Sequence, residues 1–138
     1  MTAMPTSPVA PRAVFERLIG DIAARRWHTA ADLYAEDAVV DILFAPPQPG
    51  RLEGRETIRA HFTAAAAGPL SLEVYDVTIH DTTDPEVIVA EFWYRGHVAG
   101  SDRTFEAANV QVIRVRDGLI AWSRDYHNHA AIAAALAG

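Results

Sequence analysis

The amino-acid sequence predicts an α+β fold in which helices come first and a strongly curved, mostly antiparallel sheet follows. Apolar residues recur at helical spacing in the first half of the chain, whereas the segments after Leu70 alternate with the period of strands. The dipeptide Asp117-Gly118 between two of these strands is a strong signal for a β-hairpin. A bent sheet folded over helices leaves a conical cavity, a common form of small-molecule pocket.

The first half of the chain contains the main helices. Val14, Leu18 and Ile22 share one helical face and charged residues lie on the other, which indicates an amphipathic helix from Arg12 to the break at Trp27. A β-branched apolar segment predicts a strand, and the prolines after it require a loop because proline cannot donate to a strand ladder. The expected elements are helices over 12–26, 29–34 and 55–65, a strand over 38–44 and a loop over 45–50.

The second half is expected to form a meander of four strands. Turn-forming residues separate the strands, and the alanine-rich end of the chain predicts a short closing helix. The expected strands cover 70–80, 86–98, 103–116 and 119–127, and the closing helix covers 130–137.

Length and composition limit the classes of protein. With 138 residues the chain is expected to form one domain over 12–138, after a mobile tail at Met1–Pro11. No run reaches the roughly 18 apolar residues that a membrane span needs, and Met1–Pro11 lacks the pattern of a secretory signal, so a cytoplasmic location is expected. The chain has no cysteine, and its net charge of -6 would repel nucleic acid.

Four short segments resemble a known family. They are the run LYAEDAV at 33–39, LEGRETI at 52–58, RDGLI at 116–120 and RDY at 124–126. Together they resemble the SnoaL-like members of the nuclear transport factor 2-like superfamily. The resemblance implies a conical α+β barrel that is open at one end and pairs through its sheet. Members include polyketide cyclases, ketosteroid isomerase, limonene epoxide hydrolase and scytalone dehydratase as well as non-catalytic binding proteins, so the fold does not settle the function.

The functional positions of two enzymes in this superfamily are mostly absent. The base, the oxyanion tyrosine and the protonated acid of ketosteroid isomerase correspond to Ile42, Leu18 and about Ala108 here, and all three are apolar. The RDY run keeps one acid of the epoxide hydrolase, Asp125, but its partners fall near Phe92 and Tyr94 and at Val40 and Ile42. Neither mechanism is therefore expected in its known form.

Asp125 and His127 are the candidate catalytic residues. Strand alternation puts both side chains on one face, and the resemblance assigns that face to the pocket. A carboxylate and an imidazole on an apolar wall could act as a general acid/base pair, and burial is expected to raise the pKa of Asp125. The alternative is a structural role for Asp125, as the partner of an arginine or of a backbone amide.

The same alternation predicts the substrate-binding wall. Asn109 and Gln111 face inward, where they either bind substrate or form an internal hydrogen-bond network. Tyr94 is either a donor to a substrate carbonyl or an ordinary core tyrosine. The expected cavity wall also includes Leu18, Ile22, Val40, Ile42, Phe62 and Phe92.

Neither a metal nor a cofactor is expected. His127 and His129 form a His-x-His pair, but no third ligand lies at a recognisable spacing. His61 has the apolar neighbours Ile58 and Phe62 on its helix. A place in the core or on the surface is expected for it, and the alternative is that it reaches the cavity. The sequence has neither a glycine-rich phosphate loop nor a nucleophilic serine motif.

The outer sheet face is expected to form a homodimer. It carries Glu91, Trp93, Arg95 and Trp122, and aromatic residues and arginine are typical of interfaces. The alternative is a solvated face with one exposed tryptophan.

These observations favour an enzyme that moves protons on a small, apolar, oxygenated molecule, as an isomerase, cyclase or dehydratase does. The alternatives are a carrier that only binds in the same pocket and an oligomerising accessory domain. Polar residues that converge on the cavity would argue against the accessory domain.

Overall fold

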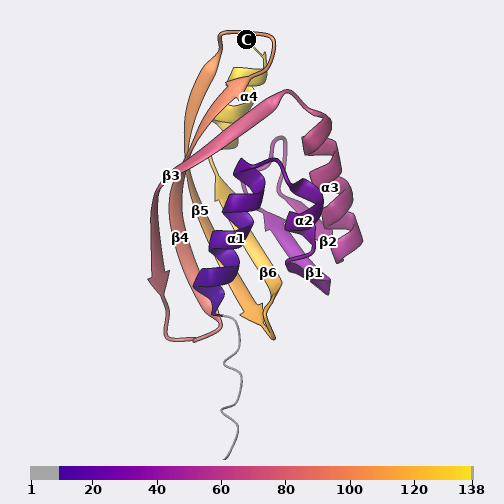
Figure 1. The fold of residues 1–138 in the computed structure, drawn as a ribbon, viewed down its shortest axis with the longest axis vertical. Coiled ribbons are helices and arrows are strands. Elements are labelled where there is room, and N and C mark those ends of the chain that lie inside the picture. Colours follow the sequence, from indigo (N-terminus) through magenta and orange to yellow (C-terminus); the bar gives the residue numbers. More distant parts are fainter. Residues whose placement is uncertain (1–9, 138) are drawn as a thin grey trace, which may run out of the picture.

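The computed structural model describes residues 10–137 as helices packed against one six-stranded mixed sheet (Figure 1). Most of the predicted tail, residues 1–9, lies outside the described residues. The elements in chain order are α1 (Pro11–Ala23), α2 (Trp27–Ala31), β1 (Tyr34–Ile42), β2 (Gly50–Glu53), α3 (Arg55–Ala67), β3 (Leu70–Asp81), β4 (Val87–Val98), β5 (Thr104–Arg116), β6 (Leu119–His127) and α4 (His129–Ala137).

The predicted four-strand meander is confirmed. The strand order across the sheet is β2-β1-β6-β5-β4-β3, so strands β3 to β6 lie beside their chain neighbours and pair antiparallel. β1 pairs parallel with β6 and antiparallel with β2. Asp117 and Gly118 both have positive φ angles, the backbone form that a two-residue hairpin turn requires.

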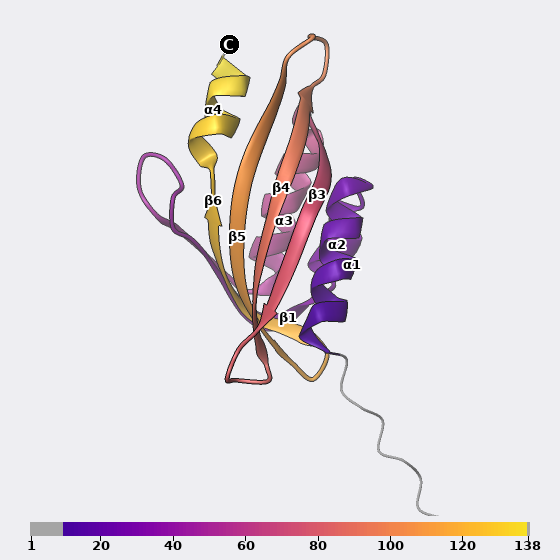
Figure 2. The same ribbon diagram turned by 90° about the vertical axis from the view of Figure 1, so that its left-hand side faces the viewer.

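The first three helices cover the inner face of the curved sheet, as Figures 1 and 2 show together. The helical face predicted for α1 is buried there: Val14 and Leu18 are almost completely inaccessible. α3 packs against α2 and β1. α4 lies apart from the other helices and contacts β5 near the end of β6 (Figure 2). None of the helices within residues 10–137 is long and apolar enough to cross a membrane.

Several predicted boundaries were wrong. Pro11 is the first residue of α1 rather than part of the tail, because proline suits the first helical turn. The short helix expected over 29–34 ends at Ala31, since Tyr34 already pairs with Ile120 of β6. Residues 50–53, for which no strand was predicted, form β2 because β1 offers them a free edge.

The predicted inward and outward faces of the long strands are confirmed. On β4 and β5, Tyr94 and Gln111 are buried, whereas Trp93 is 37% exposed. Arg114 lies on the outer face and forms ion pairs with Asp84 and Glu86. The register that carries the candidate site is therefore the expected one.

Candidate functional site

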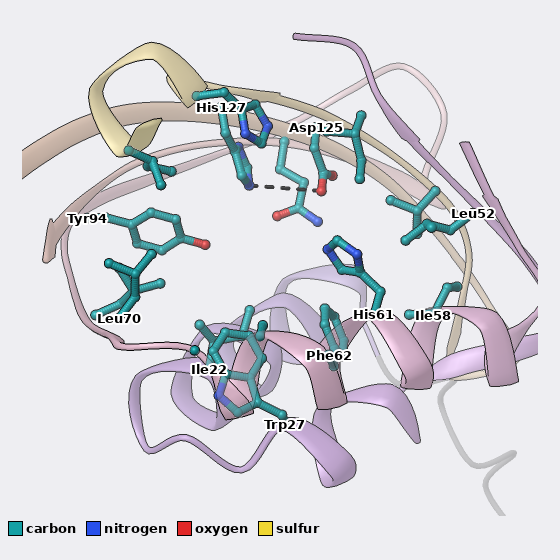
Figure 3. A pocket seen from close by; sticks show the side chains of 18 of the residues that line it. Ile22, Trp27, Leu52, Ile58, His61, Phe62, Leu70, Tyr94, Asp125 and His127 are labelled. Atoms are coloured by element: carbon teal, nitrogen blue, oxygen red, sulfur yellow. Dashed lines mark ion pairs between the residues drawn. The ribbon is translucent and has the colours of Figure 1, made fainter. Parts of the chain in front are cut away.

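The inner face of the sheet and the covering helices enclose a cavity of about 350 Å³ (Figure 3). Most of its wall is aliphatic or aromatic. From the predicted wall the structure includes Leu18, Ile22, Val40, Ile42, Phe62, Tyr94, Gln111, Asp125 and His127. The part of the wall that the sequence analysis did not predict includes Trp27, Tyr34, Leu52, Ile58, His61, Leu70, Leu72, His129, Ile132 and Leu136.

Phe92 and Asn109 were predicted in this wall, and that prediction was wrong. Both side chains face inward and are buried, but neither lines the cavity. Phe92 is covered by the ring of Phe15 from α1 and by the ring of His127, at centroid distances of 5.4 and 5.5 Å. The amide of Asn109 donates to the carbonyl of Ala107, and its oxygen accepts from the backbone N–H of Asn128. Of the two roles considered for Asn109, the internal network is the one present.

Asp125 is the one carboxylate in the cavity wall within the described residues. Its neighbour on the strand face, Ser123, donates a 2.6 Å hydrogen bond to Oδ1. Gln111 Nε2 in turn donates to Ser123 Oγ at 2.9 Å. Ser123 is completely buried; strand alternation predicts that it shares the face of Asp125 and His127, but no role was predicted for it.

Burial raises the pKa of Asp125 to about 6, which confirms the predicted direction. The Ser123 hydroxyl opposes this rise in pKa most strongly, followed by His129 and His61. His127, which is closer along the strand, is not among these causes. Asp125 thus becomes a carboxyl group that exchanges a proton close to neutral pH. Such values are useful for general acid/base catalysis.

His127 lies on the same wall (Figure 3). Its Nε2 is 4.0 Å from Asp125 Oδ2. Burial, with the neighbouring His129 as a smaller cause, lowers the pKa of His127 to about 4. Its imidazole is therefore neutral at pH 7. The His127 and His129 rings stack at 6.3 Å, and burial also lowers the pKa of His129. His61 points into the cavity from α3 on the opposite side (Figure 3).

Two tyrosines complete the polar groups. The hydroxyl of Tyr94 points into the cavity in Figure 3, and burial raises its pKa well above the ordinary value, so it remains a hydrogen-bond donor. Tyr34 from β1 also lines the cavity, and burial, together with the charge of Asp125, raises its pKa. Tyr34 was missed because its place in the wall depends on the pairing of β1 with β6.

The structure also bears on the comparison with ketosteroid isomerase that was made from the sequence. Leu18 and Ile42 line the cavity as apolar residues, so the isomerase positions that they occupy carry no acid or phenol. Ala108 is on the outer face of β5, where no group could reach the cavity. Within residues 10–137, no three His, Asp or Glu residues are arranged to hold a metal ion.

The SnoaL-like domain matches residues 15–123 of this chain. The protein belongs to this family. An uncharacterized PhzA/B-like protein of Pseudomonas aeruginosa is 34% identical to this SnoaL-like domain over 113 residues, which cover 81% of this chain and 77% of the relative.

Solved structures share the fold of this SnoaL-like protein. A Bacillus subtilis protein provisionally assigned as an isomerase superposes with a TM-score of 0.85 at 25% identity and covers 93% of both chains. A Pseudomonas putida protein provisionally assigned as a polyketide cyclase gives a TM-score of 0.76 at 17% identity, with 90% of this chain and 96% of the other covered. The predicted membership of the nuclear transport factor 2-like superfamily is confirmed.

Proposed function

We propose that this protein catalyses proton transfer on a small, apolar, oxygenated molecule held in the cavity, as an isomerase, cyclase or dehydratase. The observation that carries the proposal is the placement of Asp125: a carboxyl group anchored by Ser123 in an apolar wall, with a pKa raised to about 6. A base with such a pKa is ionised at neutral pH and still returns a proton readily. The assignments of the Bacillus subtilis and Pseudomonas putida structures are consistent with this class of reaction.

In this proposal Asp125 Oδ2 removes a proton from a carbon next to a substrate carbonyl and returns it at another atom of the same molecule. The Tyr94 hydroxyl donates a hydrogen bond to the carbonyl oxygen, where negative charge develops. His127 is neutral and leaves Asp125 without a competing cation. The apolar wall formed by residues such as Leu18, Ile42 and Phe62 binds the body of the substrate.

A test that needs no knowledge of the natural substrate is exchange of carbon-bound hydrogen for deuterium. A panel of cyclic ketones that fit the cavity is incubated in D2O with the protein and followed by NMR. We expect exchange with the wild type, loss of exchange in Asp125→Asn, and unchanged exchange in Asp37→Asn, which alters an exposed aspartate of β1. Tight binding of a ketone without hydrogen exchange would favour the alternative function, a carrier that binds small molecules in this cavity without a reaction.

A further inference from the structure

The cavity wall has an uneven charge composition. Within the described residues it includes neither lysine nor arginine, and Asp125 is its sole acid. Arg25, which contacts the wall residue Leu70, directs its guanidinium to the backbone carbonyls of Leu70 and Ala66. An anion inside the cavity would therefore meet one negative charge and no permanent positive charge.

Two of the three histidines of the wall, His127 and His129, do not supply this positive charge. Burial lowers the pKa of His127 to about 4 and lowers that of His129, so both imidazoles are neutral at pH 7. His61, on α3, is the third imidazole of the wall. Burying an ion without a partner costs several kcal/mol, because its lost hydration is not replaced.

We infer that the cavity accepts uncharged carbonyl compounds and excludes carboxylates and other anions. This inference rests on the proposed function in one respect, the exclusion of amines. A protonated amine would pair with Asp125 and so occupy the oxygen that must take the substrate proton in the proposed reaction. Two tyrosine hydroxyls, of Tyr34 and Tyr94, remain available to a carbonyl oxygen.

Three probes with one skeleton test this class by calorimetry: 4-phenyl-2-butanone, 3-phenylpropanoate and 3-phenylpropylamine. Measurements at about pH 8 keep any histidine with an ordinary pKa near 6.5 neutral. We expect the ketone to bind at least about tenfold more tightly than the carboxylate in the wild type. In Asp125→Asn the ratio of the ketone affinity to the carboxylate affinity should fall by about threefold or more, because the carboxylate probe no longer meets the negative charge of Asp125. Asp37→Asn should leave this affinity ratio unchanged.

Equal binding of ketone and carboxylate would overturn the inference, and so would no binding by any of the three. Tighter binding of the amine would show that Asp125 is a counter-ion, which also contradicts the uncharged class. These results concern binding alone. Failure of deuterium exchange with a ketone that binds as expected would instead remove the proposed reaction and leave the ligand class in place.

A second inference comes from the hydrogen bonds behind Asp125. Gln111 Nε2 can only donate, so Ser123 Oγ accepts from it and must direct its single proton to Asp125 Oδ1. Gln111 is 4% and Ser123 0% exposed, so water does not compete for these bonds. Oδ1 is thereby occupied, and Oδ2 remains toward His127 and the cavity.

We propose that Gln111 and Ser123 are positioning residues that fix which oxygen of Asp125 faces the ligand. A hydrogen bond to a carboxylate favours its ionised form. The hydrogen bond from Ser123 therefore also opposes the rise that burial causes in the pKa of Asp125. The wall position predicted for Gln111 is thus present, but its amide nitrogen serves Ser123.

NMR titration of the Asp125 carboxyl carbon tests this proposal without any substrate. Ser123→Ala should raise the pKa of Asp125 by about one pH unit, and Gln111→Met should raise it by less, because Ser123 can still donate. Ser71→Ala, on the exposed face of β3, is the matched control. An unchanged pKa in both Ser123→Ala and Gln111→Met would overturn the positioning role. Such a result would leave the proposed reaction at Asp125 untouched.

Discussion

Asp125 Oδ2 and His127 Nε2 lie 4.0 Å apart, yet burial favours the uncharged form of both side chains. The pKa of the acid rises to about 6 and that of the imidazole falls to about 4, so the usual order of the two values is reversed. Between these values the pair consists of a neutral acid and a neutral imidazole rather than an ion pair. In the proposed reaction this arrangement leaves Asp125 free to exchange protons with the substrate.

Asp125 and His127 change the pH dependence of the folding free energy in opposite directions. The raised pKa of Asp125 stabilises the fold at low pH, and that contribution is lost as pH rises from about 4 to about 6. The lowered pKa of His127 stabilises the fold at neutral pH, and that contribution is lost as pH falls from about 6.5 to about 4. In the wild type the two contributions nearly cancel.

In Asp125→Asn the pH dependence of stability that comes from His127 should no longer be cancelled by that of Asp125. We expect the variant at pH 7 to be as stable as the wild type or more stable, by up to about 3 kcal/mol, because an ionised buried acid has been removed. As pH falls from about 6.5 to about 4 the variant should lose stability relative to the wild type by about 3 kcal/mol. Urea unfolding at several pH values measures both. A loss of several kcal/mol at pH 7 would instead identify Asp125 as half of a structural ion pair.

His127→Gln should have the mirror-image behaviour. With the imidazole gone, the contribution of Asp125 is unopposed, and the variant should gain stability relative to the wild type as pH falls from about 6 to about 4. The same unfolding series shows the sign directly. A decrease in relative stability over this range would mean that His127 carries its charge in the folded state.

Gly96→Ala should destabilise the fold from a site outside the cavity. A Cβ at residue 96 would lie 2.2 Å from Cε1 and Cζ of Phe105, its partner across β4 and β5. Such overlap forces the ring or the strand to move and costs about 1–3 kcal/mol. The Phe105→Ala background provides the control, because there the second substitution should cost much less. Equal costs in both backgrounds would show that the ring is not the obstacle.

We expect a homodimer through the outer sheet face. Trp93 is 37% exposed and stacks on Tyr75 at 6.3 Å, and the guanidinium of Arg95 covers that tyrosine. Trp93→Glu should convert a dimer to a monomer by light scattering, whereas Phe44→Glu, in the loop between β1 and β2, should not. A wild-type monomer at micromolar concentration contradicts this interface.

Local sequence patterns determined which residues face the interior. Period-two alternation on β4, β5 and β6 placed Tyr94, Gln111 and Asp125 inward, and the helical spacing of Leu18 and Ile22 identified the buried face of α1. These patterns suffice because neighbouring side chains on a strand or helix have fixed relative directions. The family resemblance then supplied the arrangement of the elements.

Only the tertiary structure decided which inward residues the cavity reaches. Phe92 and Asn109 face the same way as Tyr94, but Phe15 covers Phe92 and the backbone of Asn128 binds the side chain of Asn109. Tyr34 enters the wall because β1 pairs in parallel with β6, and Ser123 becomes the anchor of Asp125 because Gln111 lies on the adjacent strand. Alternation is a property of adjacent residues, whereas accessibility and hydrogen-bond partners depend on segments far apart in the chain, whose contacts a single sequence does not encode locally.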